Sequence, residues 1–322
     1  MFIKRITHYL LTLAICAGGL VPAHAQRGSR TDSLVKALPR AKEDSNKANI
    51  LYQLANTYFT TATDKAILYG QQGVDLSTKL GWKPGIIKLA NTTGNCYSYR
   101  RDNNKAIELY QKSLKAAEEL NDKPNQAIAL RNIGNVYSYK IKDYPKAVDY
   151  YSRCQKLAEA TGNIREAGEI LSEIGSTYYM KRDYARAIDY YRQAMGKGES
   201  AGDKKLVAEN LANISAVYTS QANYPQALDF ALQSQRFYEA INDKKGIAAA
   251  LIKTGNIYNT QKDYTRALDC FVRSLKLAEE TNKKDLIAEN LQNAADVQMS
   301  LGNYPQAMQL MLRGIKVANE VG

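Results

Sequence analysis

The sequence predicts an all-α protein, built as an α-solenoid of about seven helix pairs. Three observations predict it: an internal repeat of about 40 residues, a fixed pattern of small and aromatic residues in each copy, and no segment that reads as a strand. The copies align on one position, which holds Tyr58, Tyr97, Tyr137, Tyr178, Tyr218, Tyr258 and Gln298. The aligned positions are evenly spaced with two exceptions. The spacing from Tyr58 to Tyr97 is one residue shorter than the others, and the spacing from Tyr137 to Tyr178 is one residue longer. Such regularity indicates stacked units that bury their apolar faces against one another.

The N-terminal segment before Gln26 does not follow the repeat. A basic pair at positions 4 and 5 precedes an apolar run over residues 9–20, and Ala23-His24-Ala25 is a small-x-small cleavage motif. We therefore expect a secretory signal peptide, cleaved between Ala25 and Gln26, and an exported chain that is periplasmic or extracellular. A membrane-spanning helix needs about 20 apolar residues. The run is shorter and no later segment could span a bilayer, so the mature chain is not expected to cross a membrane.

The remainder divides into a leader and the solenoid. Residues 26–44 are expected to form a polar tail and a short leader helix that stops near Pro39. Ser45 is expected to cap the first solenoid helix. The solenoid is expected over residues 45–322, with repeats at about 45–85, 86–125, 126–166, 167–206, 207–246, 247–286 and 287–322.

Each regular copy is expected to contain two helices. The first carries a small residue before the aligned tyrosine, as in Gly134-Asn135-Val136-Tyr137. Because glycine costs about 1 kcal/mol in a helix, its recurrence indicates a neighbouring helix too close for a Cβ. Asp143-Tyr144-Pro145 then suits a cap followed by proline in the first turn. The second helix buries Ala147, Tyr151 and Cys154, spaced by four and three residues. Helix stops are expected at Gly162, Gly202 and Asn242.

The residue inventory argues against several classes of protein. The formal charge is +12, but the lysines are spread through inter-repeat loops such as Asp243-Lys244-Lys245, which indicates solvated surfaces and no nucleic-acid partner. Both histidines, His8 and His24, lie in the expected signal peptide, so the mature chain has no imidazole for a nucleophilic or metal site. The three mature cysteines fall at packing positions, with a disulfide as the alternative. We therefore expect no enzymatic activity, no cofactor and no metal.

From about Leu51 to Gly322 these residues resemble tetratricopeptide repeats, in which small, Tyr, small and aromatic residues recur at these positions. The period is about 40 residues, whereas the usual unit is about 34, so each pair should carry extra helical turns. Longer repeats of this kind resemble those of kinesin light chain and of bacterial signalling regulators. The resemblance implies a right-handed superhelix whose first helices line a concave binding face.

The resemblance also implies site residues. The residue after the small one should face the concave side, and that position holds Asn56, Asn95, Asn135, Ser176, Ala216, Asn256 and Asp296. Asparagine donates and accepts together, so such a column can pair with the backbone of an extended peptide. The alternative is that asparagine serves the helix locally. Further candidates about one turn away are Lys88, Asn91, Ser98, Tyr99, Arg131, Ser138, Tyr139, Glu169, Glu209, Asn259 and Glu289. They predict a groove that is basic toward the N-terminal half and acidic beyond.

The leading interpretation is a non-catalytic, exported scaffold that binds a peptide or protein segment in this groove. One alternative is the sensory portion of a bacterial signalling system whose output module is elsewhere, because exported copies with a leader helix resemble the sensory halves of histidine kinases. A second alternative is a glycan-binding envelope protein. Leu310, Met311 and Ile315 of the last helix have no following repeat, which predicts self-association or partner docking there.

Overall fold

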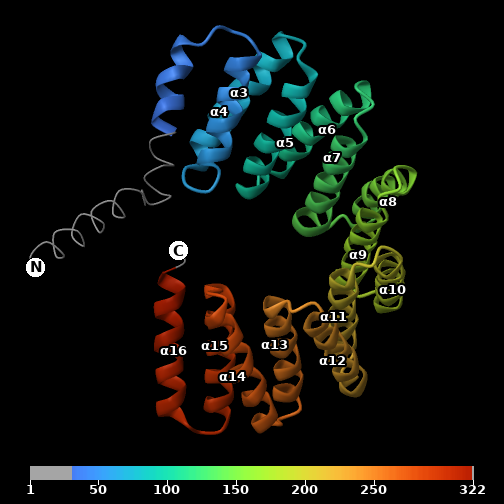
Figure 1. Ribbon diagram of the computed structural model, residues 1–322, viewed down its shortest axis with the longest axis vertical. Helices are drawn as coiled ribbons and strands as arrows, with labels where there is room; N and C mark the ends of the chain where they lie inside the picture. Colours follow the sequence, from blue (N-terminus) through green and yellow to red (C-terminus); the bar gives the residue numbers. More distant parts are fainter. Residues whose placement is uncertain (1–30, 321–322) are drawn as a thin grey trace, which may run out of the picture. The chain divides into compact units, whose positions relative to one another are not determined.

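The computed structural model describes residues 31–320, a part of the chain that is helical and contains no β-strand (Figure 1). The all-α class and the consecutive helix pairs are confirmed. The expected signal peptide and its cleavage site at Ala25 and Gln26 lie outside the described residues. Between residues 31 and 320, no helix has the length and apolar character needed to cross a membrane.

A helix over residues 31–37 and the 3-10 turn η1 (Leu38–Arg40) precede the repeats. The helices that follow are α3 (Ser45–Tyr58), α4 (Thr63–Lys79), α5 (Lys83–Tyr99), α6 (Asn103–Glu119), α7 (Lys123–Asn135), the π-helix η2 (Val136–Ile141), α8 (Tyr144–Ala160), α9 (Ile164–Met180), α10 (Tyr184–Ser200), α11 (Lys204–Ser220), α12 (Tyr224–Ala240), α13 (Lys244–Thr260), α14 (Tyr264–Glu280), α15 (Lys284–Ser300) and α16 (Tyr304–Asn319). The odd-numbered helices are the first helices of the pairs, and the even-numbered ones are the second.

The chain forms two compact units, Met1–Ala129 and Leu130–Gly322, with the boundary inside α7. Consecutive helices pack against one another from α3 to α6 in the first unit and from η2 and α8 to α16 in the second. In the second unit the first helices also contact one another directly, α9 with α11, α11 with α13, and α13 with α15. This row of first helices is the surface on which most of the predicted site residues of that unit lie.

The small residue of the first helix makes room for a ring from the second helix of the same repeat. A Cβ built on Gly134 would lie 2.7 Å from the ring of Tyr151, which is fully buried. The crowding expected at these glycines is thereby confirmed. The same arrangement joins Gly94 to Tyr110, Gly175 to Tyr191 and Gly255 to Phe271.

Side chains cap the N-termini of most of the helices, α4, α5, α15 and α16 being exceptions. The Asp143 side chain accepts a hydrogen bond from the backbone N–H of Lys146 at 3.2 Å, as expected for the cap of a second helix. The first solenoid helix corrects the prediction, because its cap is Asp44, which accepts from the N–H groups of Asn46 and Lys47. Ser45 is instead the first helical residue. The predicted stops at Gly162, Gly202 and Asn242 all have positive φ, at 70°, 66° and 53°.

One repeat is a residue longer than the others, and the extra residue is absorbed as a π-turn. The cap Asp143 follows Tyr137 one position later than the cap Asp183 follows Tyr178. The helix that begins as α7 widens into η2 over the added position and ends at Ile141, followed by the C-cap Lys142, which has φ of 64°. A single insertion inside a helix commonly produces such a turn. It accounts for the one long step in the sequence repeat.

Candidate ligand-binding surface

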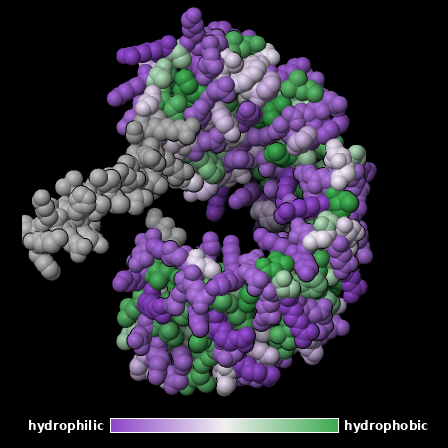
Figure 2. All heavy atoms as spheres, in the orientation of Figure 1, coloured by the Kyte–Doolittle hydropathy of each residue, from purple (hydrophilic) through white to green (hydrophobic). Residues whose placement is uncertain are grey.

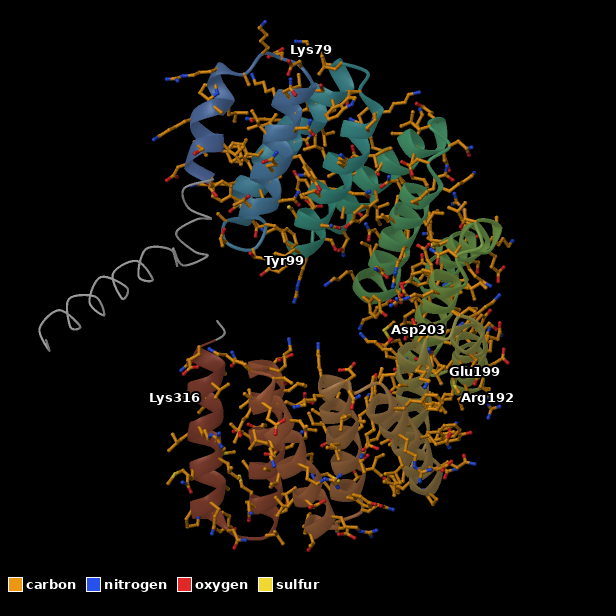
Figure 3. All side chains as sticks on the ribbon, viewed as in Figure 1. Lys79, Tyr99, Arg192, Glu199, Asp203 and Lys316 are labelled. Carbon is orange, nitrogen blue, oxygen red and sulfur yellow. The ribbon has the colours of Figure 1, made fainter. Side chains whose placement is uncertain are left out.

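The structure places every predicted groove residue on a first helix or on η2. The first unit holds Asn56, Lys88, Asn91, Asn95, Ser98 and Tyr99, and the second unit holds Arg131, Asn135, Ser138, Tyr139, Glu169, Glu209, Asn256 and Asn259. In the first unit Asn56, Lys88, Asn95 and Tyr99 are exposed, and Tyr99 is 65% exposed with its ring 5.8 Å from that of Phe59 (Figure 3).

Two members of the asparagine column have a structural partner within their own repeat. The hydroxyl of Tyr110 donates to Oδ1 of Asn95 at 2.7 Å, and the hydroxyl of Tyr151 donates to Oδ1 of Asn135 at 2.6 Å. Both tyrosines are buried, and a buried hydroxyl without a partner is costly. The alternative interpretation, that asparagine serves the fold locally, therefore applies to the carbonyl oxygens of Asn95 and Asn135. Their NH₂ groups are not used in these bonds and can bind a ligand.

Asn256 is different. The residue opposite it is Phe271, which has no hydroxyl, and Asn256 is exposed on α13. Its amide is thus not committed to a ring of its own repeat. The column contains two kinds of position, and the sequence signal that separates them is whether the ring position of the second helix holds a tyrosine, as at Tyr110 and Tyr151, or a residue without a hydroxyl, as at Phe271.

Ser138 corrects the prediction, because it is buried and does not lie on the groove surface. Its hydroxyl is 2.9 Å from that of Thr177 on α9. Ser138 lies in η2, where the wider turn changes the direction of side chains from the α-helical register that the prediction assumed. Asn91, Ser98 and Asn259 are half-buried.

Several of the remaining residues line one cavity of about 480 Å³ in the second unit. It spans three successive first helices and is lined by Arg131, Tyr139, Arg165, Glu169, Ser172, Glu173, Ser176, Asp203, Lys205, Leu206, Glu209 and Asn213. The sequence identified Arg131, Tyr139, Glu169, Ser176 and Glu209 among these and missed the charged residues Arg165, Glu173, Asp203 and Lys205. Glu173 could have been identified from the sequence, because it occupies the same position of its repeat as the polar residues Asn213 and Lys253 do in theirs.

Arg131 does not present a free positive charge. Its guanidinium lies 3.2 Å from a carboxylate oxygen of Glu169 and 3.6 Å from one of Glu173, both on the first helix of the next repeat. Partial burial alone would lower the pKa of Arg131, and the two carboxylates outweigh it and raise that pKa. Arg131 therefore links two repeats, and the basic character predicted at this position is neutralised by its neighbours.

The other cations of the cavity are paired as well. Arg165 lies 3.2 Å from Glu169 and 3.1 Å from Asp203, which also caps α11 (Figure 3). Lys205 approaches Glu209 only to 3.9 Å. The lining thus holds four carboxylates and three cations, and Glu209 has the loosest pairing of the four. Partial burial raises the pKa of Glu209, followed by opposing effects of the charges around it.

Tyr139 reaches into the cavity from η2. Its hydroxyl donates to a carboxylate oxygen of Glu173 at 2.7 Å, across the contact between two repeats. Burial raises the pKa of Tyr139, and the charge of Glu173 adds to this effect. The hydroxyl therefore stays protonated and acts as a donor.

Most of the visible molecular surface is polar, with apolar residues scattered on it (Figure 2).

A row of helix pairs whose first helices form a polar surface is characteristic of helical-repeat proteins. The family model of the tetratricopeptide repeat matches residues 86–160, 166–240 and 246–320. The chain therefore belongs to the tetratricopeptide repeat family. No curated protein matches the sequence.

Solved structures share the fold at low sequence identity. Aspartyl phosphate phosphatase F from Bacillus subtilis is 11% identical, with 93% of this chain and 95% of that chain covered and a TM-score of 0.64. BtubC from P. vanneervenii is 18% identical, with 69% and 93% covered and a TM-score of 0.58. The Rap conjugation gene regulator of the plasmid pLS20, in complex with the Phr* peptide, is 12% identical, with 92% and 96% covered and a TM-score of 0.56.

Proposed function

We propose that the protein is a non-catalytic scaffold that binds an extended peptide or protein segment across the first helices of its second unit. The observation that carries this proposal is the polar cavity, because it is lined by three successive first helices and not by one. Two fold relatives support it by analogy: the Rap regulator of pLS20 was solved with the Phr* peptide, and a Rap protein was solved in complex with Competence and Sporulation Factor.

The charges of the cavity favour a basic group on the ligand. Both arginines are already shared between two carboxylates each, so they have little attraction left for an anion. Glu209 is the carboxylate with capacity to spare, since its lysine partner is 3.9 Å away and exposed pairs of that kind are weak. An arginine or lysine side chain of the ligand would complete the charge balance.

Glu209→Gln is expected to weaken binding of a basic peptide about tenfold, which is the loss of one charge-assisted hydrogen bond. Affinity is measured by fluorescence anisotropy, with fluorescein-labelled peptides that carry one arginine or none in a neutral background. The matched control is Glu199→Gln on the second helix α10, an exposed glutamate away from the cavity (Figure 3). Equal affinity for both peptides, or equal effects of the two variants, would place binding elsewhere.

The affinity for the arginine peptide should also depend on pH, which gives a second test. Because the pKa of Glu209 is raised in the free protein, Glu209 takes up a proton at a higher pH than an ordinary glutamate as the pH falls. The charges that act on it are those of Lys205, Asp203, Glu169 and Arg165. Affinity for the arginine peptide should therefore decline on acidification before ordinary carboxylates titrate, and this early decline should vanish in Glu209→Gln.

Export belongs to the proposal as well, on the signal-like motif at residues 1–25. The mature chain is expected to begin at Gln26 and to carry no lipid. Intact-mass measurement of the protein recovered from the envelope or the medium tests this. A mass that includes Met1, or a lipid adduct, contradicts it.

The exposed face of α16 supports the alternative of a docking module within a signalling assembly. Met308, Leu312 and Ile315 are 63%, 62% and 58% exposed. The prediction based on Leu310 and Met311 needs correction, because both are half-buried, and Leu310 packs on the core beneath α16.

We expect this face to mediate self-association, since contiguous apolar surface of that kind usually marks an interface. Met308→Lys with Leu312→Glu should shift the sedimentation of a concentrated sample toward the monomer. Val272→Lys is the control, because Val272 is 61% exposed and lies on α14, outside the face of α16. A parent that sediments as a monomer at every concentration would remove the proposal.

A further inference from the structure

The turns of this fold are of two kinds, and the two kinds are built differently. A turn between the two helices of one repeat is here called an inner turn, and a turn between successive repeats is called an outer turn. Most turns of both kinds pass through one residue with positive φ, which is the left-handed conformation. A residue with a Cβ is disfavoured in this conformation, so glycine and asparagine are its usual occupants.

The outer turns of the described part of the chain follow this preference, and the inner turns do not. The outer positions with positive φ are Gly81, Asn121, Gly162, Gly202, Asn242 and Asn282. The inner positions with positive φ are Arg101, Lys142, Arg182, Ala222, Lys262 and Gly302. Four of the six inner positions thus hold a long cation where the backbone favours glycine. The outer turns end helices of similar length without such a cation, so the end of a helix does not require it.

Four exposed cations gather on two neighbouring inner turns of the second unit. They are Lys140 and Lys142 after the aligned Tyr137, and Lys181 and Arg182 after the aligned Tyr178. Just before these turns, the hydroxyl of Ser138 lies 2.9 Å from that of Thr177. The end of η2 and the end of α9 are therefore in contact, and the two turns that follow them lie side by side.

These four cations are not neutralised by carboxylates. Within residues 31–320, none of the four lies within ion-pair distance of an acidic side chain. The acidic residue of each turn is the cap, Asp143 or Asp183, and it is paired with Lys146 or Arg186 of the helix that it caps. The next inner turn, residues 220–223, carries no charge. The four cations therefore form a bounded positive patch.

An apolar side chain lies within this patch. Ile141 is 41% exposed and stands between Lys140 and Lys142. In the other inner turns that have two cations, residues 100–101 and 181–182, the cations are adjacent. The longer repeat is therefore the one that separates its two cations by an exposed apolar residue. Cations beside an exposed apolar residue suit the surface of an anionic bilayer, whereas a soluble polyanion would gain nothing from Ile141.

We propose that this patch, formed by Lys140, Ile141, Lys142, Lys181 and Arg182, binds the surface of an anionic lipid bilayer. The four cations meet the headgroups, and Ile141 enters the boundary between headgroups and acyl chains. Each lysine or arginine near such a surface strengthens binding about fivefold. The five residues do not belong to the lining of the peptide cavity, so the two sites can be tested separately.

The test uses the chain from Gln26 onward, which keeps the helices that the structure describes and omits the apolar run of residues 9–20. Co-sedimentation measures binding to vesicles of phosphatidylcholine alone and to vesicles of phosphatidylcholine and phosphatidylglycerol in equal parts. Binding should require phosphatidylglycerol and should weaken as salt is added, because the charges are exposed. Retention on heparin, a soluble polyanion, is measured in parallel.

Lys142→Gly with Arg182→Gly removes two charges and supplies the residue that the backbone conformation favours. Binding to the anionic vesicles should fall about 25-fold. The melting temperature should rise, because relief of the left-handed conformation exceeds the added freedom of the unfolded chain. The matched control is Lys204→Gln with Lys245→Gln, which removes the same net charge from exposed positions beside two outer turns. It should leave vesicle binding nearly unchanged.

Ile141→Ser distinguishes a bilayer from a soluble polyanion. It should weaken binding to the anionic vesicles about fivefold, through loss of the apolar contact, and leave retention on heparin unchanged. Glu209→Gln should bind the vesicles as the parent does, because Glu209 belongs to the peptide cavity.

Three outcomes would overturn the inference. The first is absence of binding to the anionic vesicles at low salt. The second is an equal loss in the glycine variant and in the matched control, which would mean that net charge alone drives binding. The third is a glycine variant that loses both vesicle binding and heparin retention while Ile141→Ser changes neither, which would make the patch a site for a soluble polyanion.

Discussion

Gly134→Leu is expected to destabilise the second unit by about 3 kcal/mol, the upper part of the usual range for overpacking a core. Even the first atom of a side chain at this position would lie 2.7 Å from the ring of Tyr151, and that ring is fully buried, so it has no free space to enter. Because each repeat is stabilised by its neighbours, thermal unfolding should also become broader, beginning with the repeat that holds α7 and α8. Circular dichroism and calorimetry would measure both effects.

The matched pair for this prediction is Gly134→Ala and Gly196→Ala. Both glycines lie inside helices of the second unit, but a Cβ on Gly196 would meet nothing within 4 Å. Helix propensity alone stabilises either alanine by about 0.5–1 kcal/mol. We therefore expect Gly196→Ala to raise the melting temperature and Gly134→Ala to lower it. A rise in both would mean that the ring of Tyr151 does not occupy the space beside Gly134.

Asn135→Ala is expected to cost about 1–3 kcal/mol of stability, because it leaves the buried hydroxyl of Tyr151 without its acceptor. Asn256→Ala should leave stability nearly unchanged, since no ring hydroxyl depends on Asn256. Denaturant unfolding of the two variants compares these costs directly. Asn135→Ala combined with Tyr151→Phe should recover most of the loss, because removal of both partners leaves no orphaned group.

The comparison also decides how the asparagine column is to be tested for binding. A variant of Asn95 or Asn135 changes the fold as well as the surface, so a loss of affinity there has two causes. Asn256 offers the cleaner test, because its exposed amide can be removed alone. If Asn135→Ala proved as stable as the parent, the hydrogen bond to Tyr151 would carry no net stabilisation and the column could be probed at every position.

The architecture could be predicted from the sequence because the same pattern of residues recurs in several copies of the repeat. Gly134 and Tyr151 are each ambiguous alone, but their recurrence at Gly94 and Tyr110 identifies two helices that touch at a fixed place. The direction of side chains was harder. Ser138 was expected on the surface because the helix was assumed to be regular, and the π-turn breaks that assumption.

The charges of the site could not be read from positions on one helix. Arg131 meets Glu169 and Glu173, which belong to the next repeat and face it only when the repeats are stacked. A helix-by-helix assignment therefore predicted a basic end and an acidic end where ion pairs between repeats cancel most of the charge.

The added residue in η2 has a practical meaning for any rearrangement of this array. The Tyr139 side chain begins within the widened turn, so the length of this turn as well as the tyrosine itself sets the contact of its hydroxyl with Glu173. Exchange of whole repeat cassettes would therefore conserve the fold but lose that contact unless the odd length of this cassette is kept. A graft should be designed by counting residues between the aligned tyrosine and the next cap, because point substitutions at Tyr139 cannot reproduce what a change in chain length does.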